Sequence, residues 1–253
     1  MVAQTPSISA GGILNGASFA KGVPITPGSL ITIFGTQLAA STAEADTIPL
    51  STKLGGVTVQ FVNGSTTANA PMLFANGTQI NAQVPWELVP SGATAPVSVN
   101  VIVSNNGVAS APAPVTVGPF SPGIFSSGGR AIAENADGTL AWPAGAVAGL
   151  TTHAAKPGDS IIIYATGLGA VNTPVADGHN SLDALRNTLV VPVVTIGGVT
   201  ATVQFSGLSP QFVGVNQLNV VVPNIGASDS APLQLMVGGI TTSSAITMAV
   251  ANP

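Results

Sequence analysis

The feature that most constrains the fold is an alternation of apolar and polar residues that recurs along the chain with a period of two. In QINAQVP (79–85), Ile80, Ala82 and Val84 would face one side of a strand, and the residues between them would face the other. Glycine pairs, Asn-Gly, Asp-Gly and proline interrupt such segments, which supplies hairpin turns and disfavours helices. Short alternating strands with frequent turns are typical of immunoglobulin-like β-sandwiches. The sequence therefore predicts an all-β fold.

Several of these segments occur twice, in the same order. The matching blocks are PGSLITIFGTQL (27–38) with PGDSIIIYATGL (157–168), LGGVTVQF (54–61) with IGGVTATVQF (196–205), QINAQVPWEL (79–88) with QLNVVVPNI (217–225), and APVSVNVIV (95–103) with APLQLMV (231–237). Four blocks in one order indicate an internal duplication. We therefore expect two tandem immunoglobulin-like β-sandwich modules.

The blocks divide the chain into a first module with an N-terminal arm (1–117), a connector (118–156) and a second module (157–253). The connector is rich in Gly, Pro and Ala but carries too many apolar residues for a free linker, so we expect it to be ordered and packed on both modules. The N-terminal segment 4–19 could be a first strand of module one or an arm that reaches a neighbouring molecule. Its apolar residues are Ile8, Ile13, Leu14 and Phe19.

Charge is scarce in this chain. Charged residues make up 6% of the sequence, against about 25% in ordinary globular proteins. The five Lys and Arg residues and the net charge of −4 offer no basic stripe for phosphates, so nucleic acid is excluded as a partner. No apolar run approaches the length of a membrane-spanning helix, so no transmembrane segment is expected. With so few charged residues, electrostatic repulsion between copies of the protein would be weak.

The start of the chain and its cysteine content say less. There is no cysteine, so no disulfide forms and the redox compartment cannot be read. MVAQTPSISAGG lacks the charged and apolar regions of a signal peptide. Ala3-Gln4 is interpretable as the scar of a signal peptide already removed, with Met1 added.

A string of blocks along nearly the whole chain points to a family. These blocks are ILNGASF, PGSLITIFGTQLA, QINAQVPWE, SPGIF, GRAIAENADGTL, KPGDSIIIYATGLGAV, VTIGGVTATVQFSGL and VNQLNVVVP. Together they resemble the uncharacterised C-terminal domain family of Solibacter-type acidobacterial secreted proteins. The resemblance implies a bacterial protein that is exported, and it implies no enzymatic activity. The GGV hairpins also resemble the immunoglobulin-like fold shared by plexins and transcription factors.

Catalytic motifs are weak. His153 and His179 are the only histidines available as bases for a nucleophile. DGHNS (177–181) places Asp177, His179 and Ser181 close in sequence, but a triad depends on convergent geometry that a turn does not imply. There is no GxSxG elbow, and TGLGAVN (166–172) does not complete GxGxxG. We therefore expect no enzyme and no cofactor.

Calcium is a minor option. Glu134 with Asp137, and Asp177 with Asp183, could supply oxygen ligands. Neither pair lies in a defined calcium loop, and the Asp-Gly steps are typical of turns.

Aromatic residues are few. Trp86 lies at a strand end and Trp142 in the connector, where either could form a sugar platform or an intermodule contact. Phe34 and Tyr164 occupy equivalent strand positions, which we interpret as core packing.

These observations favour a secreted or cell-surface, non-enzymatic protein with a structural or adhesive role that self-assembles into a filament or surface layer. Its partners would be further copies of itself or other cell-surface components, with the arm and the connector making the contacts between subunits. Strand addition at sheet edges that carry few charges would join the copies. The alternative is a monomeric carbohydrate-binding or spacer module cut from a larger secreted protein, with glycans as partners.

Overall fold

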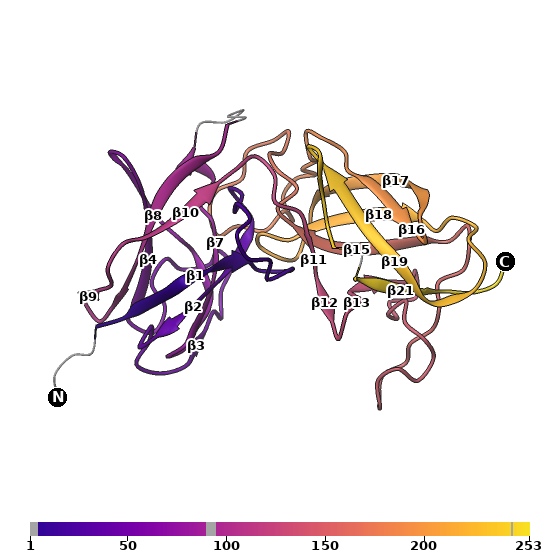
Figure 1. The fold of residues 1–253 in the computed structure, drawn as a ribbon, viewed down its shortest axis with the longest axis horizontal. Coiled ribbons are helices and arrows are strands. Elements are labelled where there is room, and N and C mark those ends of the chain that lie inside the picture. Colours follow the sequence, from indigo (N-terminus) through magenta and orange to yellow (C-terminus); the bar gives the residue numbers. More distant parts are fainter. Residues whose placement is uncertain (1–4, 90–94, 244) are drawn as a thin grey trace.

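A computed structural model describes residues 5–89, 95–243 and 245–253, which form two β-sandwiches side by side (Figure 1). The strands of the first half are β1 (Ser7–Asn15), β2 (Leu30–Thr36), β3 (Ala43–Glu44), β4 (Val57–Asn63), β5 (Thr66–Asn69), β6 (Met72–Ala75), β7 (Gln79–Gln83), β8 (Val97–Asn105), β9 (Val108–Ala109) and β10 (Ala113–Val117). Those of the second half are β11 (Gly123–Ile124), β12 (Ser126–Ser127), β13 (Arg130–Ala131), β14 (Ala133–Glu134), β15 (Ser160–Thr166), β16 (Val193–Ile196), β17 (Val199–Leu208), β18 (Asn216–Val221), β19 (Ser228–Val237), β20 (Ile240–Thr241) and β21 (Thr247–Val250). The helical content of the described residues is one 3₁₀ turn, η1 (Trp86–Leu88). The predicted all-β class is confirmed.

The first half is a sandwich of two antiparallel sheets. Their strand orders are β1-β2-β7-β6-β3 and β10-β8-β4-β5, with β9 paired to β8. The alternation in the sequence sends Ile33 and Ile80 inward from one sheet and Val59 and Phe61 inward from the other, and all four are fully buried. Burial of these apolar side chains holds the two sheets together.

The second half is built on the same plan, but its two layers are linked through one long strand. The first part of β17 pairs with β16, and its last part pairs with β18. The strand order therefore runs β11-β15-β18-β17-β16-β19-β21-β13-β12 without a break. Ile161, Ile163, Leu218 and Leu235 are fully buried in the core between the layers.

The two halves share their strand register. Ile33 pairs with Ile80 in the first half, and Ile163 pairs with Leu218 at the matching position of the second. A bulge follows Met72 on β6, and another follows Val203 on β17. This agreement is what a duplication would produce, and the duplication itself remains a prediction.

One of the four repeated blocks does not mark equivalent strands. Gly55-Gly56 precedes β4, which pairs with β8, whereas Gly197-Gly198 precedes β17, which pairs with β16 and β18. The strand equivalent to β4 is β16, because it pairs with β19 as β4 pairs with β8. The resemblance of the blocks comes from one turn type, since φ is 56° and 82° at the first glycine pair and 60° and 81° at the second. A two-residue hairpin with both φ angles positive favours glycine wherever it occurs.

Residues 118–156, expected to be a connector packed on both modules, contribute strands mainly to the second half. Strands β11 and β14 pair with β15, and β13 pairs with β21. Among the described residues, its hydrogen bonds to the first half come from the start of the segment, where the Gly118 N–H donates to Ile25 O and Ser121 O accepts from the Asn15 amide.

The segment predicted to be either a first strand or an arm is strand β1 at the edge of the first sheet. Ile13 and Leu14 are buried, Ile8 is half-buried, and Phe19 is 49% exposed in the turn that follows. Burial of Ile13 and Leu14 fixes the strand to its own sandwich, so the described residues do not form a free arm. Residue 4, where the predicted arm began, lies outside the described residues.

Hydrogen bonds join the two sandwiches. The Asn15 side chain donates to Ser121 O at 2.7 Å, and the Leu30 N–H donates to Thr166 Oγ1 at 2.9 Å. Three further bonds connect the turn at residues 177–178 to the first half: Trp86 N–H to Asp177 Oδ1 at 2.9 Å, Gly178 N–H to Gln83 Oε1 at 2.7 Å, and Leu50 N–H to Gly178 O at 2.8 Å.

Candidate ligand-binding face

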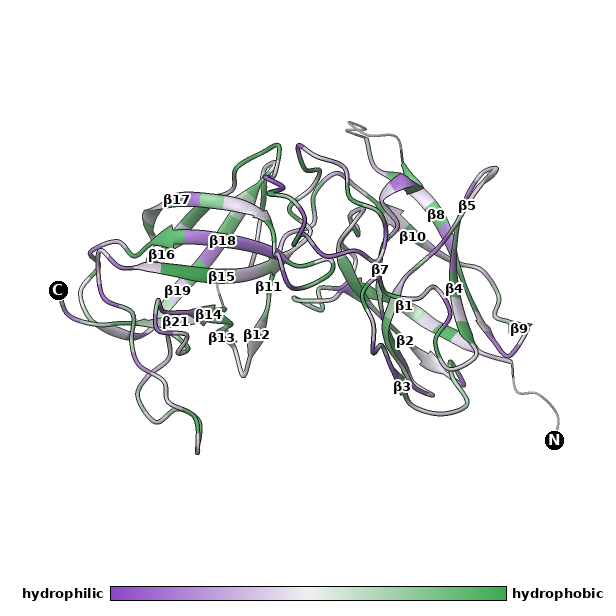
Figure 2. Ribbon diagram, turned by 180° about the vertical axis from the view of Figure 1, so that it is seen from behind, coloured by the Kyte–Doolittle hydropathy of each residue, from purple (hydrophilic) through white to green (hydrophobic). Residues whose placement is uncertain are grey.

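The outer surface of the second sandwich carries aromatic rings beside amides on strands β15, β18 and β17. Tyr164 pairs with Gln217, and Asn219 pairs with Phe205, so all four side chains share one face of the sheet. All four are half-buried. Figure 2 shows β18 as a largely hydrophilic strand between its two neighbours. We call these four residues the ring-and-amide face.

The amides of this face have unused hydrogen-bonding capacity. Gln217 Nε2 donates to Asn219 Oδ1 at 2.9 Å, which orients both side chains. Among the described residues, no acceptor is bonded to Asn219 Nδ2 and no donor to Gln217 Oε1. A carboxamide carries two N–H donors and an oxygen acceptor. The pair therefore offers both donors and an acceptor to a ligand.

A loop residue adds a further aromatic ring to this face, and a carboxylate orients the ring of Tyr164. Phe212, 50% exposed, meets Tyr164 edge-on with ring centroids 5.9 Å apart. The Tyr164 hydroxyl donates to Glu134 Oε2 at 3.2 Å. Burial and the nearby Glu134 carboxylate raise the pKa of Tyr164 above its ordinary value. The phenol therefore keeps its proton at neutral pH.

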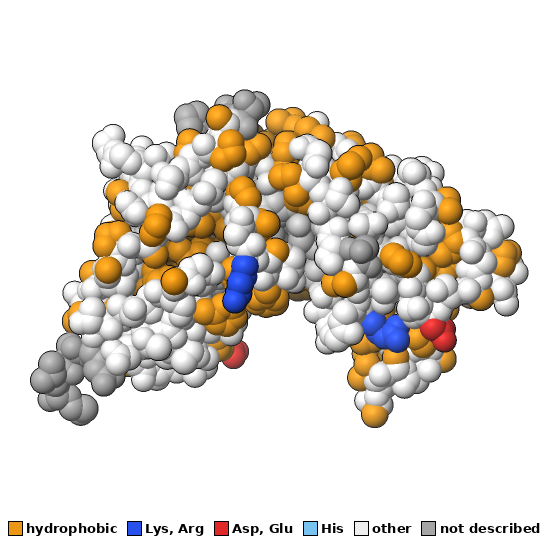
Figure 3. Space-filling view, viewed as in Figure 1, with side chains coloured by type: hydrophobic (Ala, Val, Ile, Leu, Met, Phe, Trp, Pro, Cys, Tyr) orange, Lys and Arg blue, Asp and Glu red, His pale blue; other side chains and the backbone are white. Residues whose placement is uncertain are grey.

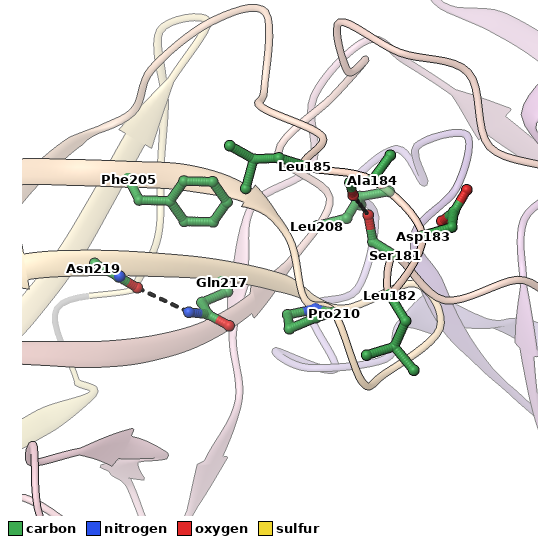
Figure 4. Close-up of a pocket in the computed structure, with 10 residues that line it drawn as sticks. All are labelled: Ser181, Leu182, Asp183, Ala184, Leu185, Phe205, Leu208, Pro210, Gln217 and Asn219. Carbon is green, nitrogen blue, oxygen red and sulfur yellow. Dashed lines mark hydrogen bonds between the residues drawn. The ribbon is translucent and has the colours of Figure 1, made fainter.

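A shallow cavity of ≈520 Å³ lies against this face, between the sheet and the loop 181–185. In Figure 4 the Phe205 ring and Leu185 form an apolar side, and the Gln217–Asn219 pair lies beneath them. Arg186 anchors the loop, because its guanidinium donates to both carboxylate oxygens of Asp183 at 2.7 and 3.0 Å and to Ser181 Oγ at 3.1 Å. These contacts hold the cavity wall in place.

The two tryptophans predicted as candidate platforms lie elsewhere. Trp142 is 6% exposed and its indole N–H donates to Ala131 O, so it presents no ring to a ligand and the sugar-platform alternative is wrong for this residue. The Trp86 ring packs on Gly28, where even a Cβ would lie 2.1 Å from the indole. The Trp86 backbone N–H donates to Asp177 Oδ1, so the intermodule contact at this residue is made by the backbone, and the role predicted for the ring stays a prediction.

Each of the four candidate calcium ligands accepts hydrogen bonds from different residues. Glu134 accepts from Tyr164, Asp137 from Thr139 and His153, Asp177 from Trp86 N–H, and Asp183 from Arg186. Hydrogen bonds from Thr139 and His153 hold the pKa of Asp137 well below its usual range, and the bond from Arg186 lowers that of Asp183 to about 2. Within the described ranges, no three His, Asp or Glu side chains gather as a metal site would require.

The short string that holds Asp177, His179 and Ser181 forms no triad. Asp177 faces the first sandwich, and Ser181 Oγ donates to Ala184 O. No hydrogen bond between described residues joins any of these three side chains to another, so the sequence neighbours do not converge on one point.

Tyr164 and Phe34, expected in the core, lie on outer faces. Ile161 and Ile163 take the inward positions of β15, so the residue between Ile163 and Ala165 must point outward. Sequence reasoning also missed Phe205, Phe212, Gln217 and Asn219. The available signal was the repetition of Gln-x-Asn on the polar side of the two strands.

No family model matches the chain, and no curated protein matches it. Among solved structures, the chain is similar to the SGBP-B protein of the Bacteroides ovatus mixed-linkage glucan utilization locus, solved with a heptasaccharide (TM-score 0.36, 12% identity, 90% of this chain and 43% of that chain). It is similar to domains 5–6 of the S-layer protein SbsC (TM-score 0.26, 10% identity, 98% and 99% covered). It is also similar to a pair of tandem Ig domains of titin (TM-score 0.21, 10% identity, 89% and 90% covered).

The chain spans less than half the length of the SGBP-B chain, and the function proposed below rests on its own residues. The fold class is all-β, with two β-sandwiches, as the sequence predicts. The family resemblance to Solibacter-type proteins remains a prediction. Among the described residues, no helix has the length and hydrophobicity needed to span a bilayer.

Proposed function

We propose that this protein is a non-enzymatic, extracellular adhesive protein that binds a neutral polysaccharide on the ring-and-amide face. The observation that carries the proposal is the pairing of half-exposed rings with unused amide groups in a fixed cross-strand register. Secretion belongs to the proposal, because it would bring the face to polysaccharides outside the cell.

The chemistry of the face fits a sugar ring. A pyranose presents a flat patch of C–H bonds, which packs on an aromatic face, and a rim of hydroxyls that both donate and accept hydrogen bonds. Phe205 and Tyr164 supply the rings, and Gln217 and Asn219 supply a donor and an acceptor side by side. A few polar groups set among apolar ones are typical of small-ligand sites.

Charge selects a neutral ligand over an acidic one. Glu134 is fixed beside Tyr164, and Asp183 lines the cavity. Glu134 would repel a uronic acid, as would the net charge of −4, whereas the charge of Asp183 is compensated by Arg186. On the face of the molecule seen in Figure 3, charged groups are few and most of the surface is uncharged.

The carboxylates of the site favour binding over hydrolysis. Glycoside hydrolysis needs a carboxylic acid that can protonate the leaving oxygen, facing a second carboxylate. Asp183 is held by Arg186, and its pKa of about 2 leaves it without a proton at neutral pH. Glu134 is hydrogen-bonded to Tyr164 instead of facing a second carboxylate.

Native-gel retardation tests the proposal. The protein is run through gels that contain β-glucan, xylan, galactomannan or polygalacturonate, the last as the acidic comparison. We expect retardation by at least one neutral polymer and a loss of more than about tenfold in affinity for Asn219→Ala, since two donors disappear. Thr202→Ala, an exposed change on β17, is the matched control. Failure of every neutral polymer to retard the wild-type chain would sink the proposal.

Self-assembly into a filament or surface layer is the second candidate. Strand β1 is a sheet edge without a charged residue, and a groove of ≈580 Å³ separates it from the edge strand β10. Uncharged edges are open to strand addition. Pro112 and Pro114 line the same groove and lack N–H donors, which blunts the β10 side.

A further inference from the structure

The outer face of the first sandwich repeats the four residues described above. Phe34 pairs with Gln79, and Asn81 pairs with Phe74, in the same cross-strand arrangement as on the second sandwich. Gln79 Nε2 donates to Asn81 Oδ1 at 2.9 Å, the same distance as between Gln217 and Asn219. All four side chains are half-buried.

The surroundings of this quartet also match. Phe19, 49% exposed, lies over Phe34 with ring centroids 6.3 Å apart, as Phe212 lies against Tyr164. Glu44 pairs with Phe74 and places one carboxylate on this face; the carboxylate on the other face, Glu134, lies beside Tyr164 instead of Phe205. Each outer face therefore carries an aromatic residue on a central strand, a second aromatic residue in a turn or loop beside it, and a Phe on the strand that contains the bulge. Two carboxamides and one carboxylate complete each set.

Folding alone does not require this agreement. Inward residues such as Ile80 and Leu218 must be apolar to fill a core, but outward positions of a strand tolerate most side chains. Rings left half-exposed also stabilise less than buried ones. A shared ligand supplies a reason for both outer faces to keep the same groups.

Resting on the proposed function, we propose that the first sandwich carries a second site for a neutral polysaccharide, formed by Phe34, Phe74, Gln79 and Asn81, so that one chain binds two sugar segments. The occupant follows from the chemistry of the face: among the described residues no acceptor is bonded to Asn81 Nδ2, and the ring positions are flanked by amides instead of cations. An anionic ligand would meet the Glu44 carboxylate, which is not a member of the ion pairs formed among the described residues.

The two sites are not equal. Phe34 lacks the hydroxyl of Tyr164, and Asn81 Oδ1 already accepts from Thr32 at 3.2 Å as well as from Gln79. Thr32 pairs with Asn81, and the residue that pairs with Asn219 at the equivalent position of the second face is Ile162, which has no hydroxyl. The first site therefore offers less acceptor capacity to the sugar, and we expect it to bind several-fold more weakly.

Titration calorimetry with a short oligosaccharide of the polymer that retards the protein measures the number of sites. We expect about two oligosaccharides per chain for the wild type and about one for Asn81→Ala or Asn219→Ala, with none for the double variant. On the intact polymer each single variant should lose more than tenfold in apparent affinity, because the two sites act together. Asn100→Ala, an exposed asparagine change on the other sheet of the first half, is the control.

The outcomes separate the two proposals. One oligosaccharide per chain, abolished by Asn219→Ala and unchanged by Asn81→Ala, overturns the second site and leaves the proposed function intact. No binding by the wild type overturns the function itself. If circular dichroism shows that Asn81→Ala is unfolded, Asn81→Asp keeps the side-chain shape, removes the donors and is measured in its place.

Discussion

Asp177 is an acidic side chain held against the neighbouring sandwich. Its Oδ1 accepts the Trp86 N–H, and Glu87 lies next to it. Burial raises the pKa of Asp177 to about 7, and the Glu87 carboxylate adds to the rise. A raised pKa in the folded state means that folding takes up a proton between the ordinary value of 3.8 and about 7. Stability is therefore fully present at low pH and falls as pH rises through this window.

The variant Asp177→Asn removes this titration and keeps an acceptor for Trp86. We expect the wild type to lose stability between pH of about 4.5 and about 8, and the variant to lose less. Urea unfolding at three pH values across that range measures the difference.

His153 also has a raised pKa, so its contribution falls at the upper end of the window in both proteins and cancels in the comparison. Parallel stability curves for the two proteins would contradict the role of Asp177.

Two hairpins show how an element is fixed by one side chain. In the β8–β9 hairpin, Ser110 Oγ accepts the Val103 N–H at 3.1 Å, and in the β19–β20 hairpin Thr242 Oγ1 accepts the Leu235 N–H at 2.9 Å. Both hydroxyls belong to buried residues. Each replaces a strand partner that the short returning strand does not supply.

Ser110→Ala and Thr242→Val should each destabilise the protein by about 1–2 kcal/mol, because each leaves a buried N–H without an acceptor. Urea unfolding compares them with Ser98→Ala, an exposed change on β8. A loss in one hairpin and none in the other would show that the two sites are not equivalent.

Strands were predicted correctly from the sequence where apolar and polar residues alternate. The alternation in residues 79–85 and 217–222 gave strands of the right type, because inward residues must be apolar. It failed for β11 to β14, which have two residues each and show no period. It also failed at the glycine hairpins, where one turn type occurs at two places in the fold. The ring-and-amide face was not predicted, because an outward Gln or Asn cannot be told from any solvated residue until its cross-strand partner is known.

At the scale of the whole molecule, two sandwiches of one chain meet through a set of hydrogen bonds and expose little charge. Asn15 shows how firmly the junction is built: it is 1% exposed, donates across to Ser121 O, and accepts from Ala17 and Ser18 N–H. If copies associate, the open edge of β1 is where we expect contact.

Self-assembly predicts particles far larger than the 24.8 kDa chain in light scattering on a size-exclusion column. Ala10→Lys, on the exposed part of β1, should then restore the single chain, because a charge on a sheet edge opposes strand addition. Deleting residues 1–15 is a poorer test, since Ile13 and Leu14 belong to the fold. A wild-type peak at the mass of one chain would rule out assembly at that concentration.

The scarcity of charge has a consequence for the setting in which the protein can work. Attraction between ions weakens as salt rises, since the screening length shrinks from about 30 Å at 0.01 M to about 3 Å at 1 M. Contacts made by aromatic rings and amides involve no net charge, so this screening does not weaken them. We therefore expect binding through Gln217, Asn219 and their neighbours to have a similar affinity at the low salt concentration of fresh water and at the high salt concentration of drying soil or brine.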